Sequence, residues 1–201
     1  MKTAIVGSGG HAGVVMDAAS LLGIQFDGII DDTLEAGSRI GLIEVLGGTS
    51  ENYADYSVFI AIGNNESRRR ICESIKVGGF MPAIIHPSAN VATSAMIGRG
   101  VFIAAGANIG NKSSVGLMSI VNTHANLDHD SSIGMFSHLA PNSSTGGRVT
   151  IMDECLIGIG ASIRDGISIG SRTTIGMGSV VTKSIIGGTN FGNPCKSATT
   201  T

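Results

Sequence analysis

A six-residue repeat is the feature that most constrains how this chain folds. Sixteen consecutive hexapeptides run from Val91 to Ile186, and all but one open with a branched apolar residue. A period of six fits neither an α-helix nor a flat amphipathic strand, but it fits a parallel β-helix with one short strand and one turn per hexapeptide. Three units would close a triangular coil, with the openers stacked inside and small residues at the corners. The openers are Val91, Ile97, Ile103, Ile109, Val115, Val121, Leu127, Ile133, Leu139, Thr145, Ile151, Ile157, Ile163, Ile169, Ile175 and Val181.

Composition excludes several classes of protein. Of the 201 residues 14% are charged, and the net charge is −2, so the charge does not favour binding to nucleic acid. No apolar run is long enough to span a membrane, and the first residues lack the layout of a signal peptide. The three cysteines, Cys72, Cys155 and Cys195, lie far apart and fit reduced thiols. These features predict a cytoplasmic protein without a membrane partner.

The segment before the repeat has a different pattern. Strand-like runs at 2–6, 26–30 and 57–62 are each followed by a turn, and helical patterns follow the first and the third. Strands that alternate with helices predict a small parallel sheet. The chain changes character near His86-Pro87, so we expect an α/β, Rossmann-like half domain over residues 1–82 and the β-helix over residues 83–201.

A glycine-rich turn joins the first strand to the first helix. Such a turn lets backbone N–H groups approach an anion at a helix N-terminus, and an acidic pair follows the next strand, where a ribose or base contact is common. The short domain favours a mononucleotide, such as half of a sugar nucleotide, over NAD. The alternative is a turn that merely packs helix on sheet, with His11 as a cap or surface residue. The predicted substrate contacts are Gly9, Gly10, His11, Gly13, Asp31, Asp32, Gly63 and Asn64.

A histidine between two aspartates interrupts the repeat. Asp128-His129-Asp130 begins just after the opener Leu127, so His129 should lie at an outer face or edge. A carboxylate can fix the tautomer of a histidine and stabilise its imidazolium, as a general base requires. The alternative is a solvated loop without a catalytic role.

The whole chain resembles the bacterial sugar O-acyltransferase family, which has a left-handed parallel β-helix built from hexapeptide repeats. This family includes sialic acid O-acetyltransferases and N-acetyltransferases of nucleotide-linked 4-amino-sugars. The matching segments span both domains in order: GSGGHAG at 7–13, DD at 31–32, AIGNN at 61–65, HPSA at 86–89, DHD at 128–130 and GNPCK at 192–196.

The resemblance implies a set of roles. His129 would be the general base, oriented by Asp130 or by its rival Asp128; the amino-sugar enzymes have the longer glutamate at the place of Asp130. His138 would approach the acetyl thioester, and the Gly147 N–H would hold the oxyanion. The residues implied to bind acetyl-CoA are His138, Gly147, Ile159 and Lys196, the last in the C-terminal tail.

The predicted activity is acetyl transfer from acetyl-CoA to the 4-amino group of a nucleotide-linked amino-sugar in surface glycan biosynthesis. The resemblance also implies a homotrimer with coenzyme A between neighbouring β-helices and no metal. Outward Met118, Phe136 and Met177 are compatible with that subunit packing.

Three alternatives remain open at this point. The chain could O-acetylate sialic acid or another free sugar. It could be a zinc hydratase of the gamma carbonic anhydrase kind, since His124 and His129 have the spacing of two zinc ligands, although the repeat from Val91 to Val121 holds no third histidine. It could also be a non-catalytic scaffold. The nucleotide base and the sugar stay undetermined.

Overall fold

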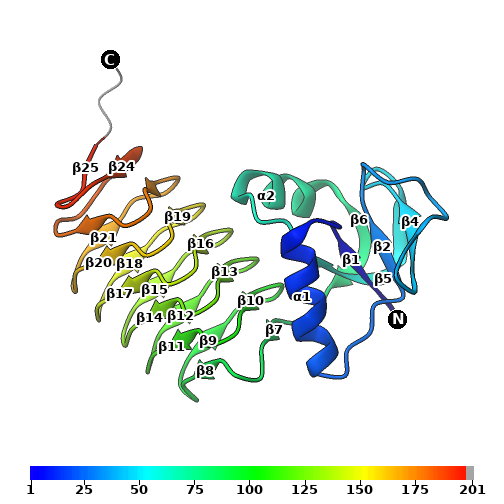
Figure 1. The fold of residues 1–201 in the computed structure, drawn as a ribbon, viewed down its shortest axis with the longest axis horizontal. Helices are drawn as coiled ribbons and strands as arrows, with labels where there is room; N and C mark the ends of the chain where they lie inside the picture. Colours follow the sequence, from blue (N-terminus) through cyan, green and yellow to red (C-terminus); the bar gives the residue numbers. More distant parts are fainter. Residues whose placement is uncertain (198–201) are drawn as a thin grey trace.

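The protein combines a six-stranded α/β sheet with a long β-helix, and the sheet domain lies against the first coils (Figure 1). This computed structural model describes residues 1–197. The last residues of the predicted tail, 198–201, lie outside the described residues.

The N-terminal sheet has the order β3-β4-β2-β1-β5-β6 and is parallel except for the β3-β4 hairpin. Its elements are β1 (Lys2–Val6), α1 (Gly10–Leu21), β2 (Gly28–Ile30), β3 (Arg39–Ile40), β4 (Ile43–Gly47), β5 (Asn52–Ile60), α2 (Asn65–Ser74) and β6 (Lys76–Phe80). The carboxyl ends of β1, β2 and β5 meet at one edge, as the parallel sheet requires.

The strands of this domain differ from the sequence prediction in several places. The strand expected at 26–30 begins at Gly28, the strand expected at 57–62 spans Asn52–Ile60, and neither β6 nor the hairpin of β3 and β4 was predicted. The hairpin is short and lies at the sheet edge, where its first strand is exposed on both faces. Without a buried face, such a strand leaves no apolar alternation in the sequence.

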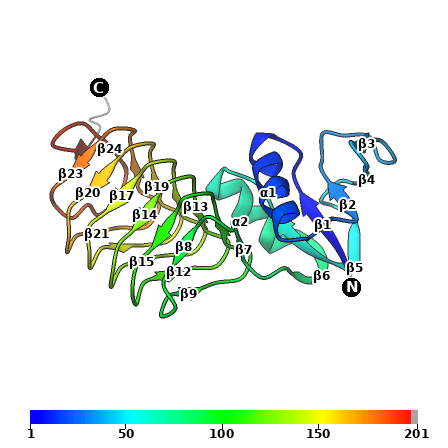
Figure 2. The same ribbon diagram turned by 60° about the horizontal axis from the view of Figure 1, so that its bottom comes forward.

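Three faces of short strands form the β-helix (Figure 2), and the strands are parallel except for the last one of face 1, which pairs antiparallel with its neighbour. Face 1 holds β7 (Ile84–Ile85), β10 (Phe102–Ile103), β13 (Ile120–Val121), β16 (His138–Leu139), β19 (Leu156–Ile157), β22 (Thr174–Ile175), β24 (Thr189–Phe191) and β25 (Lys196–Ser197). Face 2 holds β8 (Asn90–Val91), β11 (Asn108–Ile109), β14 (Asn126–Leu127), β17 (Ser144–Thr145), β20 (Ser162–Ile163) and β23 (Val180–Val181). Face 3 holds β9 (Met96–Ile97), β12 (Ser114–Val115), β15 (Ser132–Ile133), β18 (Thr150–Ile151) and β21 (Ser168–Ile169).

The interior is built from two residues of each hexapeptide rather than one. The openers from Ile103 to Val181 are buried, as predicted. The residue two places before an opener also points inward in most coils, and this position holds small, branched or hydroxyl side chains. The inward serines bridge coils: Ser113 Oγ donates to the Asp128 carbonyl and accepts from the Ser131 N–H. These buried hydroxyls therefore have partners.

The corners match only in part the expectation that small residues would serve them. In fourteen of the sixteen units the residue three places after an opener has a positive φ; five of these positions hold glycine, and nine carry side chains with φ between 54° and 59°. They are Lys112, Met118, His124, Asp130, Phe136, Asn142, Arg148, Glu154 and Arg172. The glycines that follow openers serve close approach instead: a Cβ on Gly98 would lie 2.8 Å from the Leu117 nitrogen of the next coil.

Apolar packing joins the two domains. Ala12 and Val15 of α1 share a buried cluster with Phe102 and Ile120, which point outward from face 1. Met118 and Phe136 are buried against the sheet domain, so the expectation that they serve subunit packing is wrong for these two residues. Met177 is 78% exposed and remains available for such packing. The division at residues 82 and 83 falls between β6 and β7.

We predict that Ile151→Ala lowers the free energy of unfolding by about 2–4 kcal/mol, because it opens a cavity in the stacked interior. Ile151 is 1% exposed, whereas its neighbour Met152 is 49% exposed. Met152→Ala, the matched control, should change stability by less than about 0.5 kcal/mol. Urea unfolding followed by circular dichroism measures both, and equal losses would contradict the inward stacking.

Candidate active site

The glycine turn and the acidic pair lie at the same sheet edge. A cavity of about 420 Å³, the sheet-edge cavity, is lined by Gly7, Ser8, Gly9, Asp31, Asp32, Thr33, Thr49, Ser67 and Arg70, among others. Ser8 Oγ donates to Asp31 Oδ2 over 2.6 Å, and the Thr49 N–H donates to Asp32 Oδ1 over 2.6 Å. Burial raises the pKa of Asp31, but hydrogen bonds from Ser8 and Thr33 outweigh it, so the pKa lies below its usual value. Asp31 is therefore an anionic acceptor at neutral pH.

His11 lies away from this cavity, at the junction of the two domains. It occupies the first turn of α1, with Gly10 and Gly13, and its ring packs edge-on against Phe102 at 5.6 Å between centroids. The ring of His138, on β16, lies 6.5 Å away. Within residues 1–197 the buried Nε2 of His11 has no hydrogen-bond partner. That atom can still bond to a substrate.

Burial and one cation keep both junction histidines neutral. Burial first, and the charge of Arg68 second, lower the pKa of His138 to about 3. The same two causes lower the pKa of His11 to about 4. Neither imidazole therefore carries a charge at neutral pH, and neither can serve as a cationic contact there.

Hydrogen bonds assign the tautomer of His138. The side-chain Oδ1 of Asn122 accepts from the Thr123 N–H, which turns the side-chain Nδ2 of Asn122 toward His138 Nε2 at 3.0 Å. Nε2 therefore accepts a hydrogen bond from Asn122. The neutral ring thus carries its proton on Nδ1.

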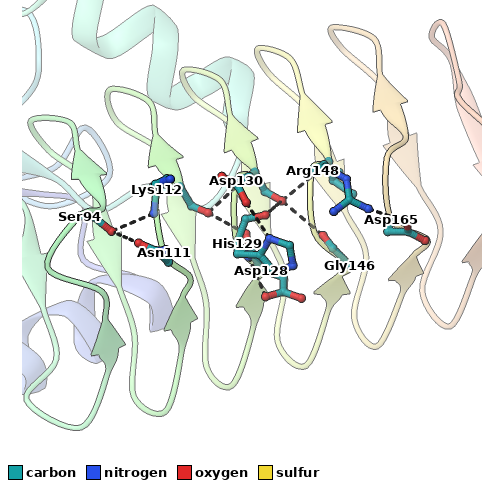
Figure 3. Close-up of polar contacts among 12 residues, drawn as sticks. Ser94, Asn111, Lys112, Asp128, His129, Asp130, Gly146, Arg148 and Asp165 are labelled. Carbon is teal, nitrogen blue, oxygen red and sulfur yellow. Dashed lines mark hydrogen bonds and ion pairs between the residues drawn. The ribbon is translucent and has the colours of Figure 1, made fainter.

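The Asp128-His129-Asp130 turn lies at the corner between β14 and β15, as Figure 3 shows. His129 Nδ1 lies 2.8 Å from Asp130 Oδ2, while Asp128 Oδ1 accepts from the backbone N–H of His129 over 2.7 Å. Asp130 is thus the ring partner in this geometry, and Asp128 stabilises the turn. The hydrogen bond with His129 lowers the pKa of Asp130, and nearby Lys112 and Arg148 add to this effect.

The free face of the His129 ring meets Gly147 in the next coil. A Cβ on Gly147 would lie 2.5 Å from His129 Nε2. Among residues 1–197 the Gly147 N–H has no hydrogen-bond acceptor. A base nitrogen and an unused N–H donor are therefore neighbours, as a reaction that develops an oxyanion beside the base requires.

Thr145, the one polar opener, supports this turn from inside the β-helix. Its side chain is buried, and its hydroxyl accepts from the Asp128 N–H over 3.1 Å. The sequence marks Thr145 as an exception to the repeat, but only the coil stacking connects it to the turn one coil before. It is a site residue that the sequence analysis missed.

The first turn of α2 borders a second cavity. Gly63 and Asn64 line this junction cleft of about 430 Å³ together with Asn65, Glu66, Arg69, Glu154, Leu156, Arg172 and Thr174. Arg69 Nε lies 3.1 Å from Glu154 Oε2, and Asn65 Nδ2 donates to the Cys155 carbonyl over 2.9 Å. The cleft therefore runs along the outer side of face 1, beyond His138.

One chain does not bring all predicted residues together. His129, Asp130 and Gly147 form one group on the corner between faces 2 and 3. His138 instead lies on face 1, next to His11 of α1. Ile159 follows β19 and is 53% exposed, and Lys196 lies in β25 beside a cavity with Lys183 and Cys195.

The two histidines with zinc-like spacing do not converge within the chain either. His124 precedes β14 and His129 follows it, so they occupy two different corners. In the described part of the chain, no group of three or more His, Cys, Asp or Glu side chains could hold a metal ion.

No helix within residues 1–197 has the length and apolarity to cross a membrane.

We predict that the free energy of unfolding falls as the pH drops from about 6.5 to 4. His11 and His138 have lowered pKa values in the folded state, so the unfolded chain binds protons first, and the stabilising contribution present above pH 6.5 is lost on acidification. Each histidine should contribute on the order of 2 kcal/mol.

Urea unfolding between pH 7 and pH 4.5 measures how the free energy of unfolding depends on pH. His11→Gln should make this slope shallower. His124→Asn, at an exposed corner position that asparagine tolerates, should leave the slope unchanged. An unaltered slope in the His11 variant would contradict the buried, neutral state.

Two protein families match separate parts of the chain. The PglD N-terminal domain family matches residues 2–75, and the bacterial transferase hexapeptide family (six repeats) matches residues 148–183. The predicted fold, an α/β domain followed by a left-handed β-helix of hexapeptide repeats, is confirmed.

Solved structures match the whole chain. The acetyltransferase domain of PglB from Neisseria gonorrhoeae FA1090 is 34% identical, with a TM-score of 0.87 over 98% of this chain and 99% of that one. PerB from Caulobacter crescentus, solved in complex with CoA and GDP-perosamine, is 32% identical, with a TM-score of 0.85 over 98% and 96%.

A curated relative matches over a shorter region. The UDP-N-acetylbacillosamine N-acetyltransferase of Bacillus subtilis (strain 168) is 35% identical over 112 residues, which are 52% of this chain and 51% of that protein. The match thus spans about half the length of that relative. With similarity to acetyltransferases over nearly its full length and both family patterns in order, the chain belongs to the bacterial hexapeptide-repeat transferases that carry a PglD N-terminal domain.

Proposed function

We propose that this protein transfers the acetyl group of acetyl-CoA to the 4-amino group of a nucleotide-linked amino-sugar. The observation that carries the proposal is the contact of His129 with Asp130 on one side and Gly147 on the other. The named activities of the relatives support the reaction class, and PerB in complex with GDP-perosamine supports a nucleotide-sugar acceptor.

In the proposed mechanism, His129 is the general base. Asp130 accepts the Nδ1 proton of the ring, which leaves the Nε2 lone pair free to take a proton from the sugar amine as it attacks the thioester carbonyl. The Gly147 N–H donates to the oxyanion that develops on that carbonyl. The C–S bond then breaks, and coenzyme A leaves as the thiolate. A thioester is already an activated acyl donor, so the proposed reaction needs no metal.

The proposed substrate path uses the remaining predicted residues. The nucleotide would occupy the sheet-edge cavity, where Asp31 and Asp32 are hydrogen-bond acceptors and Gly9 leaves the backbone accessible. The sugar would extend toward the unpartnered Nε2 of His11, past Gly10, Gly13, Gly63 and Asn64. Acetyl-CoA would contact His138, Gly147, Ile159 and Lys196, and the PglB domain has been solved in complex with acetyl coenzyme A.

The separation of His129 from His138 supports a shared site. Because these residues lie on different sides of one β-helix, a second copy must supply the base to a sugar held near His138. A homotrimer, with coenzyme A between neighbouring β-helices, satisfies this requirement by symmetry. A cytoplasmic location is part of the proposal, since three free cysteines suit a reducing compartment.

We predict that the purified protein adds one acetyl group, about 42 Da by mass spectrometry, to one member of a panel of UDP-, GDP- and dTDP-linked 4-amino-sugars. His129→Ala should lower turnover by about 10²–10⁴ without unfolding the protein. His124→Asn, on the neighbouring corner of the same coil, is the matched control and should retain activity. Acetylation of free sialic acid alone would favour the O-acetyltransferase alternative, and no transfer to any acceptor would favour the scaffold.

A second prediction tests the shared site. Co-expressed His129→Ala and His138→Asn chains should form mixed assemblies with at least about tenfold more activity than either variant alone, because one interface then keeps both wild-type residues. Light scattering should give the mass of three chains. Mixed assemblies that stay as inactive as the parents would contradict a site made by two copies.

A further inference from the structure

Arg68 is the largest fully buried side chain of the protein's described residues, and it is an arginine. It lies on α2 and is 1% exposed, while the next two residues of the helix, Arg69 and Arg70, are more accessible. Burial lowers the pKa of Arg68 to about 10, so the guanidinium stays charged at neutral pH. A buried charge of this kind is costly unless its hydrogen bonds are complete.

All five guanidinium N–H groups have an acceptor. Nε donates to the Met118 carbonyl over 2.6 Å; Nη1 donates to the carbonyls of Ile62 and Gly63 over 2.7 and 3.0 Å. Nη2 donates to Asn65 Oδ1 over 2.7 Å and to the Phe136 carbonyl over 2.9 Å. None of these acceptors is a carboxylate. Arg68 is therefore a hydrogen-bonding centre rather than half of an ion pair.

The acceptors come from the two domains. Ile62 and Gly63 belong to the loop that leads from β5 into α2, and Asn65 is the first residue of α2. Met118 and Phe136 are corner residues of two successive β-helix coils. A single side chain thus fixes the loop of the sheet domain relative to the coil that leads into His138. The planar guanidinium can span these carbonyls, and a lysine ammonium, with three donors, cannot.

The backbone that leads into His138 is held by the same guanidinium. Arg68 Nη2 donates to the Phe136 carbonyl over 2.9 Å and reaches the Ser137 carbonyl at 3.4 Å, and Ser137 directly precedes His138. Asn122 Nδ2 contacts Nε2 of the ring at 3.0 Å. The direction of His138 therefore depends on a backbone whose position Arg68 fixes.

We propose that Arg68 is a positioning residue that fixes the Ile62–Gly63 loop and the start of α2 on the β-helix and, through the Phe136 and Ser137 carbonyls, orients the His138 ring toward Asn122 and so sets its tautomer. The inference rests on the proposed function, since it assigns His138 and the loop to the substrates of acetyl transfer. Arg68 itself contacts neither the sheet-edge cavity nor the junction cleft.

The charge of Arg68 supports the same role. Within residues 1–197, the charged or titratable groups that act on His138 are Arg68 from α2 and His11 from α1, and the uncharged Asn122 contacts the ring from the β-helix. The guanidinium disfavours a second positive charge on the imidazole. The lone pair of Nε2 thus stays available as an acceptor across the neutral pH range.

A first experiment uses the wild-type protein. Long-range ¹H–¹⁵N correlation spectra of histidine-labelled protein should show His138 as a neutral ring with its proton on Nδ1 from pH 5 to 8, with assignment from His138→Asn. A ring that titrates in this range, or one with its proton on Nε2, overturns the proposal without reference to any activity.

A second experiment changes the arginine. Arg68→Met removes the charge and the hydrogen-bond donors. In this variant the His138 signal should titrate or change tautomer, and KM for the sugar nucleotide should rise about tenfold or more. Its kcat/KM should also fall toward acidic pH. Arg68→Lys, which keeps the charge, should restore the neutral ring and the pH profile but not KM. Arg99→Met is the matched control: Arg99 also donates to a carbonyl of the sheet domain, that of Phe80, but from an exposed position remote from His138.

The outcomes separate the inference from the proposed function. Normal His138 signals and normal KM in Arg68→Met would overturn the positioning role, as would equal effects from Arg99→Met. If Arg68→Met does not fold, the Arg68→Lys protein and the wild-type spectra still decide the question. If wild-type protein acetylates no acceptor, the proposed function fails, while the spectra of His138 continue to test Arg68.

Discussion

Parallel hydrogen bonding between residues eighteen positions apart is the constraint on which the rest of the structure depends. Asn108 pairs with Asn126, and Ser114 pairs with Ser132, so every side chain lies above its equivalent in the previous coil. The corner that carries His129 therefore receives its neighbours from distant parts of the sequence: Asn111 and Lys112 precede it and Arg148 follows it (Figure 3), next to Gly147. The positive φ of Asp130 comes from the same rule, because the corner position imposes it and not the residue type.

The sheet domain packs on the regular outer surface of face 1. The outward column of face 1 reads Ile84, Phe102, Ile120, His138, Leu156 and Thr174 from one end to the other. The first three are buried in the core shared with α1. His138 takes the next place, where that apolar cover ends. A polar ring at the boundary of a dry interface is partly desolvated and still reachable, and this environment lowers its pKa.

Much of this architecture could be predicted from the chain alone. The period of six predicted the coil and its buried openers, and the glycine turn predicted the first strand and helix with the acidic pair at the same edge. The sequence could not show that Arg68 is buried while Arg69 and Arg70 are not, since three consecutive arginines look alike until a partner surface covers one of them. Nor could it choose between Asp128 and Asp130, because both flank His129 and only the turn geometry directs one of them to the ring. Thr145 stood out as an irregularity, but its bond to the Asp128 N–H depends on coil stacking, which sequence proximity does not reveal.

The stacked strands also fix the distances along the β-helix axis. From β16, which carries His138, the strands β19, β22 and β24 follow one another along face 1 toward Lys183 and Lys196. At about 4.8 Å between neighbouring strands, the three steps from β16 to β24 span about 14 Å, and Lys196 lies one strand farther, in β25. This span can change only by whole coils, since a fractional change would rotate every column to another face. For a long, thin donor bound along face 1, as we propose, the solenoid therefore sets the distance between its two ends in whole coils.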